Sequence, residues 1–304
     1  MTTTVLVPDE QGEVALAGVE GLEVVRFAGD TPLPPAAERA EVLIPGFLVA
    51  PDPAALLARL PRLRLIQLLT AGAEDWIGRV PDHIMLSVAR GAHGGSTAEW
   101  ALATLLAVYR DLIPFERDRV ARTWVRRPTE TLQDKRVLVI GAGDLGTRLK
   151  RRLEACDAHV TLVGTAAREG VHGMAETPDL LGEHDAVVLM VPLTPATTGM
   201  VDAAFLSRMR DGAVLVNAAR GKVVDTSALL AELVSGRLRA ALDVTEPEPL
   251  PVDHPLWTAP GLLLTPHVAA SVHEYQRRGY AVAAAEIARF AAGERPLNLV
   301  RGDY

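Results

Sequence analysis

A glycine-rich turn between a predicted strand and a predicted helix constrains this chain more than any other feature. Residues 137–140 form a short, apolar, largely β-branched run, and Gly141, Gly143 and Gly146 follow in the spacing G-x-G-x-x-G. From Leu145 onward, leucines recur every fourth residue, which is typical of a helix. In this setting Gly141 permits a tight turn, Gly143 lets a pyrophosphate approach the backbone, and Gly146 lets the helix pack on the strand. The motif therefore predicts a dinucleotide site at the N-terminus of that helix.

Length and composition bound the remaining possibilities. The chain has 304 residues, of which 49% are hydrophobic and 23% charged, so it is long enough for about two domains with sizeable cores. Its net charge of −7 argues against a nucleic-acid partner. Cys156 is the only cysteine, which excludes an intrachain disulfide and a cysteine-based zinc site. No metal site is expected.

The sequence also predicts neither a secretory signal nor a membrane span. Residues 1–4 lead directly into a strand-like run, without a basic segment followed by an apolar one. The apolar run over residues 98–108 is too short to cross a bilayer. We therefore expect a cytoplasmic protein that has no membrane partner.

Residues 1–95 alternate short apolar strands with helix-like stretches, which predicts a parallel sheet covered by helices. The predicted strands are residues 5–7, 23–27, 42–44, 65–69 and 85–88. The clearest helix covers residues 54–60, with Pro53 suited to its first turn.

Two further helical stretches come next. Ser96 or Thr97 can cap a mostly apolar helix that runs to about Arg110, since Glu99 then lies in its first turn. This helix leads out of the first sheet and is expected to connect two domains. The arginine-rich stretch over residues 115–127 forms either an arm or a surface helix, and the sequence leaves both open.

The second half of the chain predicts a second sheet. Its strands are near-continuous apolar runs, as expected when both faces of a parallel sheet are buried. These predicted strands are residues 137–140, 160–163, 186–190, 213–216, 238–242 and 262–264. Six strands with helical crossovers, such as residues 226–234, match a doubly wound sheet.

The end of the chain determines the expected domain organisation. A last long helix covers about residues 272–292, and the tail over residues 297–300 is expected to return to the first domain. We therefore expect an α/β protein of two doubly wound domains. One is formed by residues 1–98 with 285–304, and the other by residues 99–284.

Three polar residues follow predicted strands of the second sheet. Arg220 precedes a glycine and offers a planar fork for a carboxylate, although by position alone a solvated loop arginine is the commoner case. Glu248 lies in a proline-rich acidic loop that is either a plain connector or a rigid support for a base. His267 can exchange a proton near neutral pH. Because ligands of doubly wound sheets lie at the carboxyl ends of the strands, these residues together indicate a catalytic site.

The chain resembles the NAD(P)-dependent D-2-hydroxyacid dehydrogenases over essentially its whole length. The resemblance is most specific in the second domain, and its motifs are residues 141–146, 191–197, 217–225, 243–249 and 265–267. It implies a Rossmann nucleotide-binding domain inserted into a flavodoxin-like substrate domain. It also implies reduction of a small 2-oxo acid, such as glyoxylate or hydroxypyruvate, to the D-2-hydroxy acid by hydride transfer from NAD(P)H.

The resemblance further implies roles for individual residues. Arg220 would orient the substrate, His267 would be the acid/base, Glu248 would pair with His267, and Asp243 would lie near the nicotinamide. The residues expected to bind the cofactor are Gly141, Gly143, Asp144, Leu145, Gly146, Gly164, Thr165, Arg168, Val191, Pro192, Thr197, Ala218, Ala219, Arg220, Asp243 and His267. The residues expected to bind the substrate are Ala71, Gly72, Ala73, Arg220 and His267. The family commonly dimerises through its nucleotide domain, so a homodimer with residues 102–124 in the contact is expected.

One position departs from the pattern of NAD-preferring enzymes. These enzymes place an acid at the end of the second strand to bind the ribose 2′-hydroxyl, whereas this chain has Gly164. Thr165 can donate a hydroxyl to a phosphate, and Arg168 can supply positive charge. We therefore predict a preference for NADP over NAD.

Two alternative functions stay open. The first is a related enzyme that acts on phosphite or on a bulkier 2-oxo acid. The second is an NAD(P)-sensing binding protein or corepressor on the same fold, since the fold alone does not determine function. Glu248 argues against formate oxidation, because formate-specific relatives have a different partner for the histidine.

Overall fold

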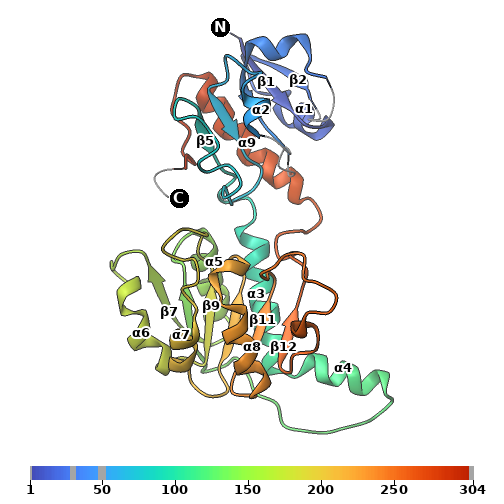
Figure 1. Ribbon diagram of the computed structural model, residues 1–304, viewed down its shortest axis with the longest axis vertical. Coiled ribbons are helices and arrows are strands. Elements are labelled where there is room, and N and C mark those ends of the chain that lie inside the picture. Colours follow the sequence, from blue (N-terminus) through green and yellow to red (C-terminus); the bar gives the residue numbers. More distant parts are fainter. Residues whose placement is uncertain (1, 28–31, 47–52, 301–304) are drawn as a thin grey trace. The chain divides into compact units, whose positions relative to one another are not determined.

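The computed structural model describes residues 2–27, 32–46 and 53–300, which form two units that each contain one parallel sheet (Figure 1). The strands are β1 (Thr3–Val7), β2 (Leu22–Arg26), β3 (Ala40–Leu43), β4 (Leu65–Gln67), β5 (Met85–Ser87), β6 (Arg136–Ile140), β7 (His159–Gly164), β8 (His172–Gly173), β9 (Ala186–Leu189), β10 (Val214–Asn217), β11 (Arg239–Leu242) and β12 (Leu262–Leu264). The helices are α1 (Glu10–Leu16), α2 (Pro53–Leu57), α3 (Gly94–Tyr109), α4 (Leu112–Val120), α5 (Asp144–Glu154), α6 (Thr177–Leu180), α7 (Ala203–Arg208), α8 (Thr226–Val234) and α9 (Tyr275–Ala291). Short 3₁₀ helices occupy Pro35–Arg39, Met174–Glu176, Leu181–Glu183, Gly221–Val223 and Pro255–Thr258.

The first unit is built from both ends of the chain. It comprises Met1–His93 and His273–Tyr304, and the second unit comprises Gly94–Val272. The boundary expected at residue 285 falls inside α9. In the structure α9 is one continuous helix whose buried side chains pack with those of the first sheet, so the whole helix belongs to the first unit.

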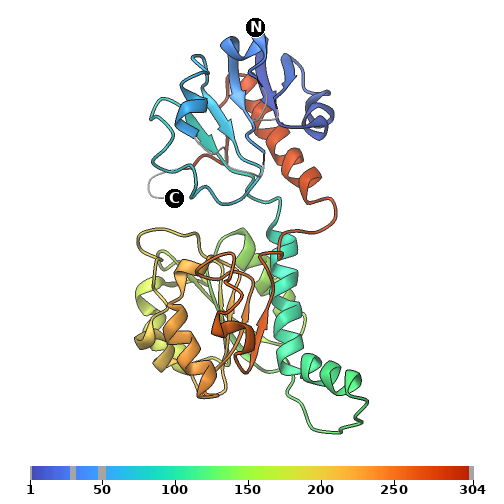
Figure 2. The ribbon, with the colours of Figure 1, turned by 45° about the vertical axis from the view of Figure 1, so that its right-hand side comes forward.

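The sheet of the first unit has the order β2-β1-β3-β4-β5, and its paired strands are parallel. This is the flavodoxin-like order, and all five predicted strands are present. Side chains of α1 and α9, including Leu16, Tyr280 and Ile287, cover one face. Leu57 and Trp76 pack in the core of the other face. Figure 2 shows α9, drawn in red, alongside this sheet.

The C-terminal tail returns to the first unit as the sequence predicted. Leu299 bridges Ser87 in antiparallel fashion, and the N–H of Val300 donates to the carbonyl of Leu86 at 2.9 Å. The buried carboxylate of Glu286 accepts the N–H groups of Leu297 and Asn298 at 2.6 and 3.0 Å. The tail therefore covers the edge strand β5, which would otherwise expose unpaired backbone groups.

The sheet of the second unit has the order β12-β11-β10-β9-β6-β7-β8 and is also parallel. Read from β8, this is the doubly wound order of Rossmann domains. The six predicted strands are present, and the seventh, β8, escaped prediction because it has only two residues. Helices α3 and α5 contribute to the core on one face, and residues of α7 and α8 contribute to the core on the other (Figure 1).

Helix α3 begins at Gly94, before the predicted caps Ser96 and Thr97, which both lie buried within the helix. This start lies close to α5. A Cβ on Gly94 would lie 2.0 Å from Oδ2 of Asp144, so a larger residue would have to displace that side chain. Glycine at this position thus leaves room for the Asp144 side chain between the two helices.

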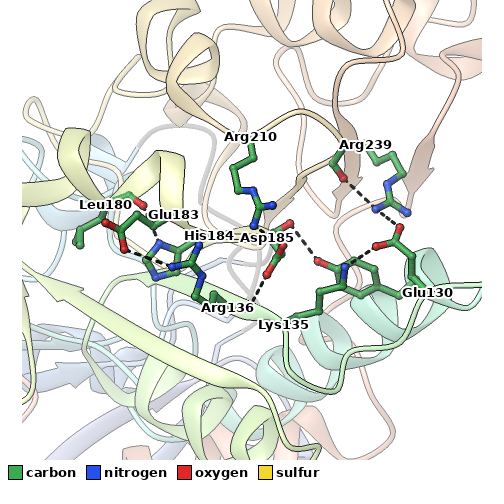
Figure 3. A network of polar contacts seen from close by, with 11 residues as sticks. Glu130, Lys135, Arg136, Leu180, Glu183, His184, Asp185, Arg210 and Arg239 are labelled. Atoms are coloured by element: carbon green, nitrogen blue, oxygen red, sulfur yellow. Dashed lines mark hydrogen bonds and ion pairs between the residues drawn. The ribbon is translucent and has the colours of Figure 1, made fainter.

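A polar network lies at the amino ends of the strands of the second sheet (Figure 3). Asp185 precedes β9, and its carboxylate accepts the N–H of Arg136 and a guanidinium N–H of Arg210, both at 2.8 Å. Glu130 pairs with Lys135 at 2.6 Å and with Arg239 at 2.8 Å. These bonds join the starts of β6, β9 and β11 to the segment that follows α4. They therefore stabilise the amino edge of the sheet, opposite the edge that carries the predicted site.

The described residues contain neither a candidate membrane span nor a candidate metal site. No helix there is long and apolar enough to cross a membrane. No group of three or more His, Cys, Asp or Glu side chains in the same residues is arranged to hold a metal ion.

Candidate active site

The glycine turn has the geometry that the sequence predicted. Gly141 has a φ of +121°, and a Cβ there would lie 2.3 Å from the carbonyl oxygen of Met190. A Cβ on Gly146 would lie 1.9 Å from the carbonyl oxygen of Gly141. Gly143, by contrast, has no atom within 4 Å of its would-be Cβ. Two glycines are thus required by packing, and the third leaves open space beside the N-terminus of α5, which fits a dinucleotide pyrophosphate.

The side chains of Asp144 and Leu145 make contacts within the protein. Oδ1 of Asp144 accepts from Nε of Arg148 at 2.7 Å, and Leu145 packs against the core between the sheet and helices α3 and α5. The ion pair balances the carboxylate charge at the helix N-terminus. Any cofactor contact of these two residues is therefore expected from the backbone.

The end of β7 carries the predicted determinants of the adenosine ribose site. The guanidinium of Arg168 donates to the carbonyl of Ala142 at 3.0 Å, and its Nη1 lies 2.8 Å from the would-be Cβ of Gly164. Arg168 and Val171 exchange two backbone hydrogen bonds of 2.9 Å, which orders the turn between them. Thr165 is exposed beside Gly164. The structure therefore places a cation beside the glycine turn, where the sequence lacks the usual acid.

The loop after β9 is organised by Thr197, which is 8% exposed. Its hydroxyl donates to the carbonyl of Pro192 at 2.7 Å and accepts from the N–H of Thr194 at 2.8 Å. Val191, directly before Pro192, is buried. These predicted cofactor residues shape the loop at the carboxyl end of β9.

Asn217 orders the loop that carries Arg220. Its side-chain amide donates to the carbonyl of Arg220 at 3.0 Å and accepts the N–H of Ala219 at 3.0 Å. Nη1 of Arg220 donates to the carbonyl of Ala219 at 2.7 Å. The loop is also pressed against the next one, because a Cβ on Gly221 would lie 1.8 Å from the carbonyl oxygen of Thr245. The chain thus brings the Arg220 loop beside the loop that carries Glu248.

His267 and Glu248 form the pair that the family resemblance implied. Nδ1 of His267 lies 2.5 Å from Oε1 of Glu248, and the two side chains are 46% and 39% exposed. His267 has a φ of +54°, a conformation that non-glycine residues rarely adopt and that often marks functional sites. Its N–H donates to the carbonyl of Asp243 at 2.7 Å. The backbone directly after β11 therefore holds the histidine in place.

The carboxylate of Asp243 is almost fully buried and supports the histidine loop. Oδ1 accepts the hydroxyl of Thr265 at 2.6 Å and the N–H of Val268 at 2.8 Å, and Oδ2 accepts the N–H of Ala269 at 2.9 Å. Asp243 was predicted as a cofactor residue, and the structure adds this supporting role. Asn217 and Thr265 have similar roles that the sequence analysis missed, although both belong to quoted motifs and lie at the ends of strands.

A cavity of about 330 Å³ adjoins the His267–Glu248 pair. It is lined by Asp243, Thr245, Glu248, Pro249, Leu250, Trp257, Leu264, Thr265, Pro266 and His267. The lining of the cavity combines polar side chains, including the His267–Glu248 pair, with apolar ones. This mixture is typical of small-molecule sites.

The loop over residues 69–73, which carries the expected substrate residues Ala71, Gly72 and Ala73, belongs to the first unit and follows β4. The hydroxyl of Thr70 donates to the carbonyl of Gly72 at 2.7 Å, and the N–H of Ala89 donates to the carbonyl of Thr70 at 2.8 Å. His93 is buried, and its Nε2 lies 2.8 Å from the carbonyl oxygen of Leu69. The loop is thus fastened by the chain around it.

Several known sequences are similar to this chain. Residues 102–269 match the family described as D-isomer specific 2-hydroxyacid dehydrogenase, NAD binding domain. A glyoxylate reductase of Korarchaeum cryptofilum (strain OPF8) is 32% identical over 271 residues, covering 83% of this chain and 80% of that protein. A D-3-phosphoglycerate dehydrogenase of Mycobacterium leprae (strain TN) is 31% identical over 304 residues. That match covers 95% of this chain but only 57% of the relative, so the chain spans little more than half of that protein.

Solved structures are similar over nearly the whole chain. A D-isomer specific 2-hydroxyacid dehydrogenase from Xanthobacter autotrophicus Py2, solved with NADPH and MES, has a TM-score of 0.87 at 32% identity and covers 99% of this chain and 98% of its own. An NADPH-dependent glyoxylate/hydroxypyruvate reductase from Sinorhizobium meliloti, solved with NADP and sulfate, has a TM-score of 0.82 at 28% identity, with coverages of 99% and 98%.

Proposed function

Because the chain belongs to the D-isomer specific 2-hydroxyacid dehydrogenases, we propose that it reduces a small 2-oxo acid to the D-2-hydroxy acid, with His267 as the acid. The protein is an NAD(P)-dependent oxidoreductase that acts on CH–OH groups, and its cofactor is NADP or NAD. Glyoxylate and hydroxypyruvate are the proposed substrates. The named activities of the Korarchaeum and Sinorhizobium relatives support this substrate class.

The observation that carries the proposal is the hydrogen bond of 2.5 Å between Nδ1 of His267 and Oε1 of Glu248. With Nδ1 engaged, Nε2 is the ring nitrogen left to give a proton to the substrate carbonyl oxygen. The carboxylate of Glu248 stabilises the positive charge of the protonated ring. The bound nicotinamide supplies the hydride. In this proposal Arg220 and the backbone of Ala71–Ala73 bind the substrate carboxylate.

Binding of NADP in preference to NAD is the second part of the proposal. It rests on Arg168, whose guanidinium lies beside the glycine turn, and on Gly164, which supplies no acid to repel a 2′-phosphate. The reductase from Sinorhizobium and the dehydrogenase from Xanthobacter were both solved with the phosphorylated cofactor. Their cofactors support the same preference here.

Initial rates test the function directly. Glyoxylate, hydroxypyruvate, pyruvate and phenylpyruvate are each supplied with NADH and with NADPH. We expect turnover of at least one small 2-oxo acid, and we expect His267→Ala to lower it by about 10²-fold or more, which is the usual scale of general-acid catalysis. Binding of NADPH, followed by its fluorescence, should survive in His267→Ala. Nucleotide binding without turnover of any 2-oxo acid would favour the non-enzymatic alternative instead.

A homodimer in the cytoplasm completes the proposal. Helix α4 has no buried residue, and Val120 and Trp124 are 69% and 93% exposed. Not all of residues 102–124 can take part in the predicted contact, because Leu105 and Tyr109 are buried in the core of their own unit. Exposed apolar side chains in one stretch of the chain favour a protein partner, and we propose a second copy of the chain.

The oligomeric state tests the dimer. Sedimentation of the purified protein should give the mass of a dimer, and Trp124→Asp should shift it towards the monomer. Val14→Asp changes an equally apolar side chain, 71% exposed, in the first unit and serves as the matched control. A wild-type monomer at micromolar concentration would contradict the proposal.

A further inference from the structure

The loop after β4 is fastened through its carbonyl groups. The carbonyl of Leu69 accepts from Nε2 of His93 at 2.8 Å, because a carbonyl oxygen can only accept. The carbonyl of Thr70 accepts the N–H of Ala89 at 2.8 Å. The carbonyl of Gly72 accepts the hydroxyl of Thr70 at 2.7 Å. Three of the peptide groups between Leu69 and Ala73 are therefore held by hydrogen bonds, two from donors of the surrounding chain and one from a hydroxyl of the loop itself.

Fixing these carbonyls also fixes the N–H groups of the same peptides. A trans peptide is planar, and its N–H points opposite to its C=O. The anchors on Leu69, Thr70 and Gly72 thus turn the N–H groups of the next residues away from His93, Ala89 and the Thr70 hydroxyl. Within the described parts of the chain, the N–H of Ala73 donates to no group, although Ala73 is only 1% exposed. A buried N–H without an acceptor is uncommon in proteins and favours a ligand as its acceptor.

We propose that His93 and Thr70 are positioning residues that orient the N–H groups of Thr70 and Ala73 towards the substrate carboxylate. The proposal rests on the proposed function, because it assumes that this loop binds the carboxylate of a 2-oxo acid. Backbone N–H groups that point into one site can bind an anion without a charged side chain. His93 acts from a buried position, 7% exposed, and Thr70 acts from within the loop.

Two substitutions separate this role from a general loss of structure. Thr70→Val removes the hydroxyl and keeps the shape, and His93→Leu removes the ring donor. His93→Gln restores an amide N–H near the position of Nε2. The matched control is Thr4→Val, since Thr4 is buried in β1 of the same unit and its hydroxyl binds Glu23 rather than the loop.

The readouts are the KM for glyoxylate or hydroxypyruvate, kcat, the dissociation constant of NADPH, and the inhibition constant of oxamate, a carboxylate analogue that does not react. We expect Thr70→Val and His93→Leu each to raise the KM and the oxamate constant by about tenfold, the scale of one hydrogen bond. The NADPH constant should stay within about twofold of wild type, and His93→Gln should recover most of the oxamate affinity.

The outcomes distinguish this inference from the proposed function. If wild type turns over a 2-oxo acid but Thr70→Val and His93→Leu match Thr4→Val in KM and in oxamate inhibition, the positioning role is wrong. The role is also wrong if the substitutions lower kcat and leave the KM and oxamate binding unchanged. If wild type neither reduces a 2-oxo acid nor binds oxamate, the proposed function fails first. If His93→Leu does not fold, Thr70→Val and His93→Gln still decide the question.

Discussion

At the residue scale, one histidine is placed by bonds from three directions. Its ring is held by Glu248, its N–H by the carbonyl of Asp243, and the residues after it by the Asp243 carboxylate. The Asp243 carboxylate is buried and accepts three hydrogen bonds, so its removal would release the loop as a whole. Preorganisation of this kind lets a proton donor act without first being ordered.

Glu248→Gln tests the pairing of Glu248 with His267. The carboxylate accepts from Nδ1 of His267, whereas an amide can also turn its NH2 group towards Nδ1 and orient the ring differently. In the proposed function His267 gives the proton, so kcat/KM for the 2-oxo acid should fall by about tenfold or more in the variant, with the dissociation constant of NADPH unchanged. The measurements are initial rates and the fluorescence of bound NADPH. Glu246→Gln changes an exposed carboxylate of the same loop and serves as the control, whose kcat/KM should follow that of wild type. An unchanged kcat/KM in Glu248→Gln would show that the carboxylate does not act through His267.

Gly164→Asp tests the cofactor preference. The new carboxylate repels a 2′-phosphate and can bind a ribose 2′-hydroxyl, so the ratio of kcat/KM for NADPH over NADH should fall by about tenfold or more. The Cβ must displace only the flexible end of Arg168 and shift slightly against Val171. Gly164→Asn adds the same bulk without the charge and should change the ratio much less. A wild type that already prefers NADH would contradict the assignment of Arg168.

At the element scale, the carboxyl and amino edges of the second sheet carry different kinds of residues. The carboxyl edge holds the glycine turn, Arg220 and His267, while the amino edge is fastened by the charged network around Asp185 (Figure 3). His184 lies beside this network. Its Nδ1 donates to the carbonyl of Leu180 at 2.7 Å, and Nε2 lies 2.9 Å from the hydroxyl of Thr161. Burial lowers the pKa of His184 below its ordinary value.

This lowered pKa predicts a loss of stability in mild acid. The unfolded chain binds a proton at His184 near pH 6.5, whereas the folded protein binds it only at lower pH. The stabilisation is therefore fully present above about pH 6.5 and is lost as the pH falls through the folded pKa. His184→Gln should flatten this part of the curve of unfolding free energy against pH, measured by urea denaturation. His159→Gln, at an exposed histidine of the same unit, should leave the curve unchanged.

At the scale of the whole molecule, the first unit includes a segment that follows the second unit in the sequence. Helix α9 covers the sheet, and the tail then pairs with β5. Glu286 connects these two parts, because its buried carboxylate accepts the N–H groups of Leu297 and Asn298. The side-chain amide of Asn298 also donates to the carbonyl of Arg90 at 3.2 Å.

Glu286→Ala should therefore destabilise the first unit selectively. It leaves two N–H groups without their charged acceptor, which costs about 3 kcal/mol. We expect a lower urea midpoint for the transition of the first unit and increased hydrogen exchange at β5, with exchange in β6 and β9 unchanged. Glu294→Ala removes an exposed carboxylate just after α9 and is the control. Equal exchange at β5 in wild type and Glu286→Ala would contradict the role of the carboxylate.

The sequence alone determined the parts of this protein that depend on local pattern. Alternating apolar runs and helical stretches predicted both parallel sheets, and the glycine spacing predicted the turn before α5. The strand pattern also predicted that Glu248 and His267 lie at the same edge of the second sheet, whereas their pairing was implied by the family resemblance. The sheets and the turn could be predicted because a short stretch of chain contains the physical cause, so the pattern can be recognised without the fold.

Only the tertiary structure decided how these residues are supported. Asp243 and the loop at Thr265 are brought together by the pairing of β11 with β12, and no local pattern states which buried carboxylate binds which loop. Gly94 at the start of α3 lies against Asp144 of α5, and α9 belongs to the first unit because its buried side chains pack against the first sheet. The link from His93 to Leu69 likewise joins residues far apart in the sequence. Such contacts depend on packing between distant segments, which the order of residues along the chain does not display.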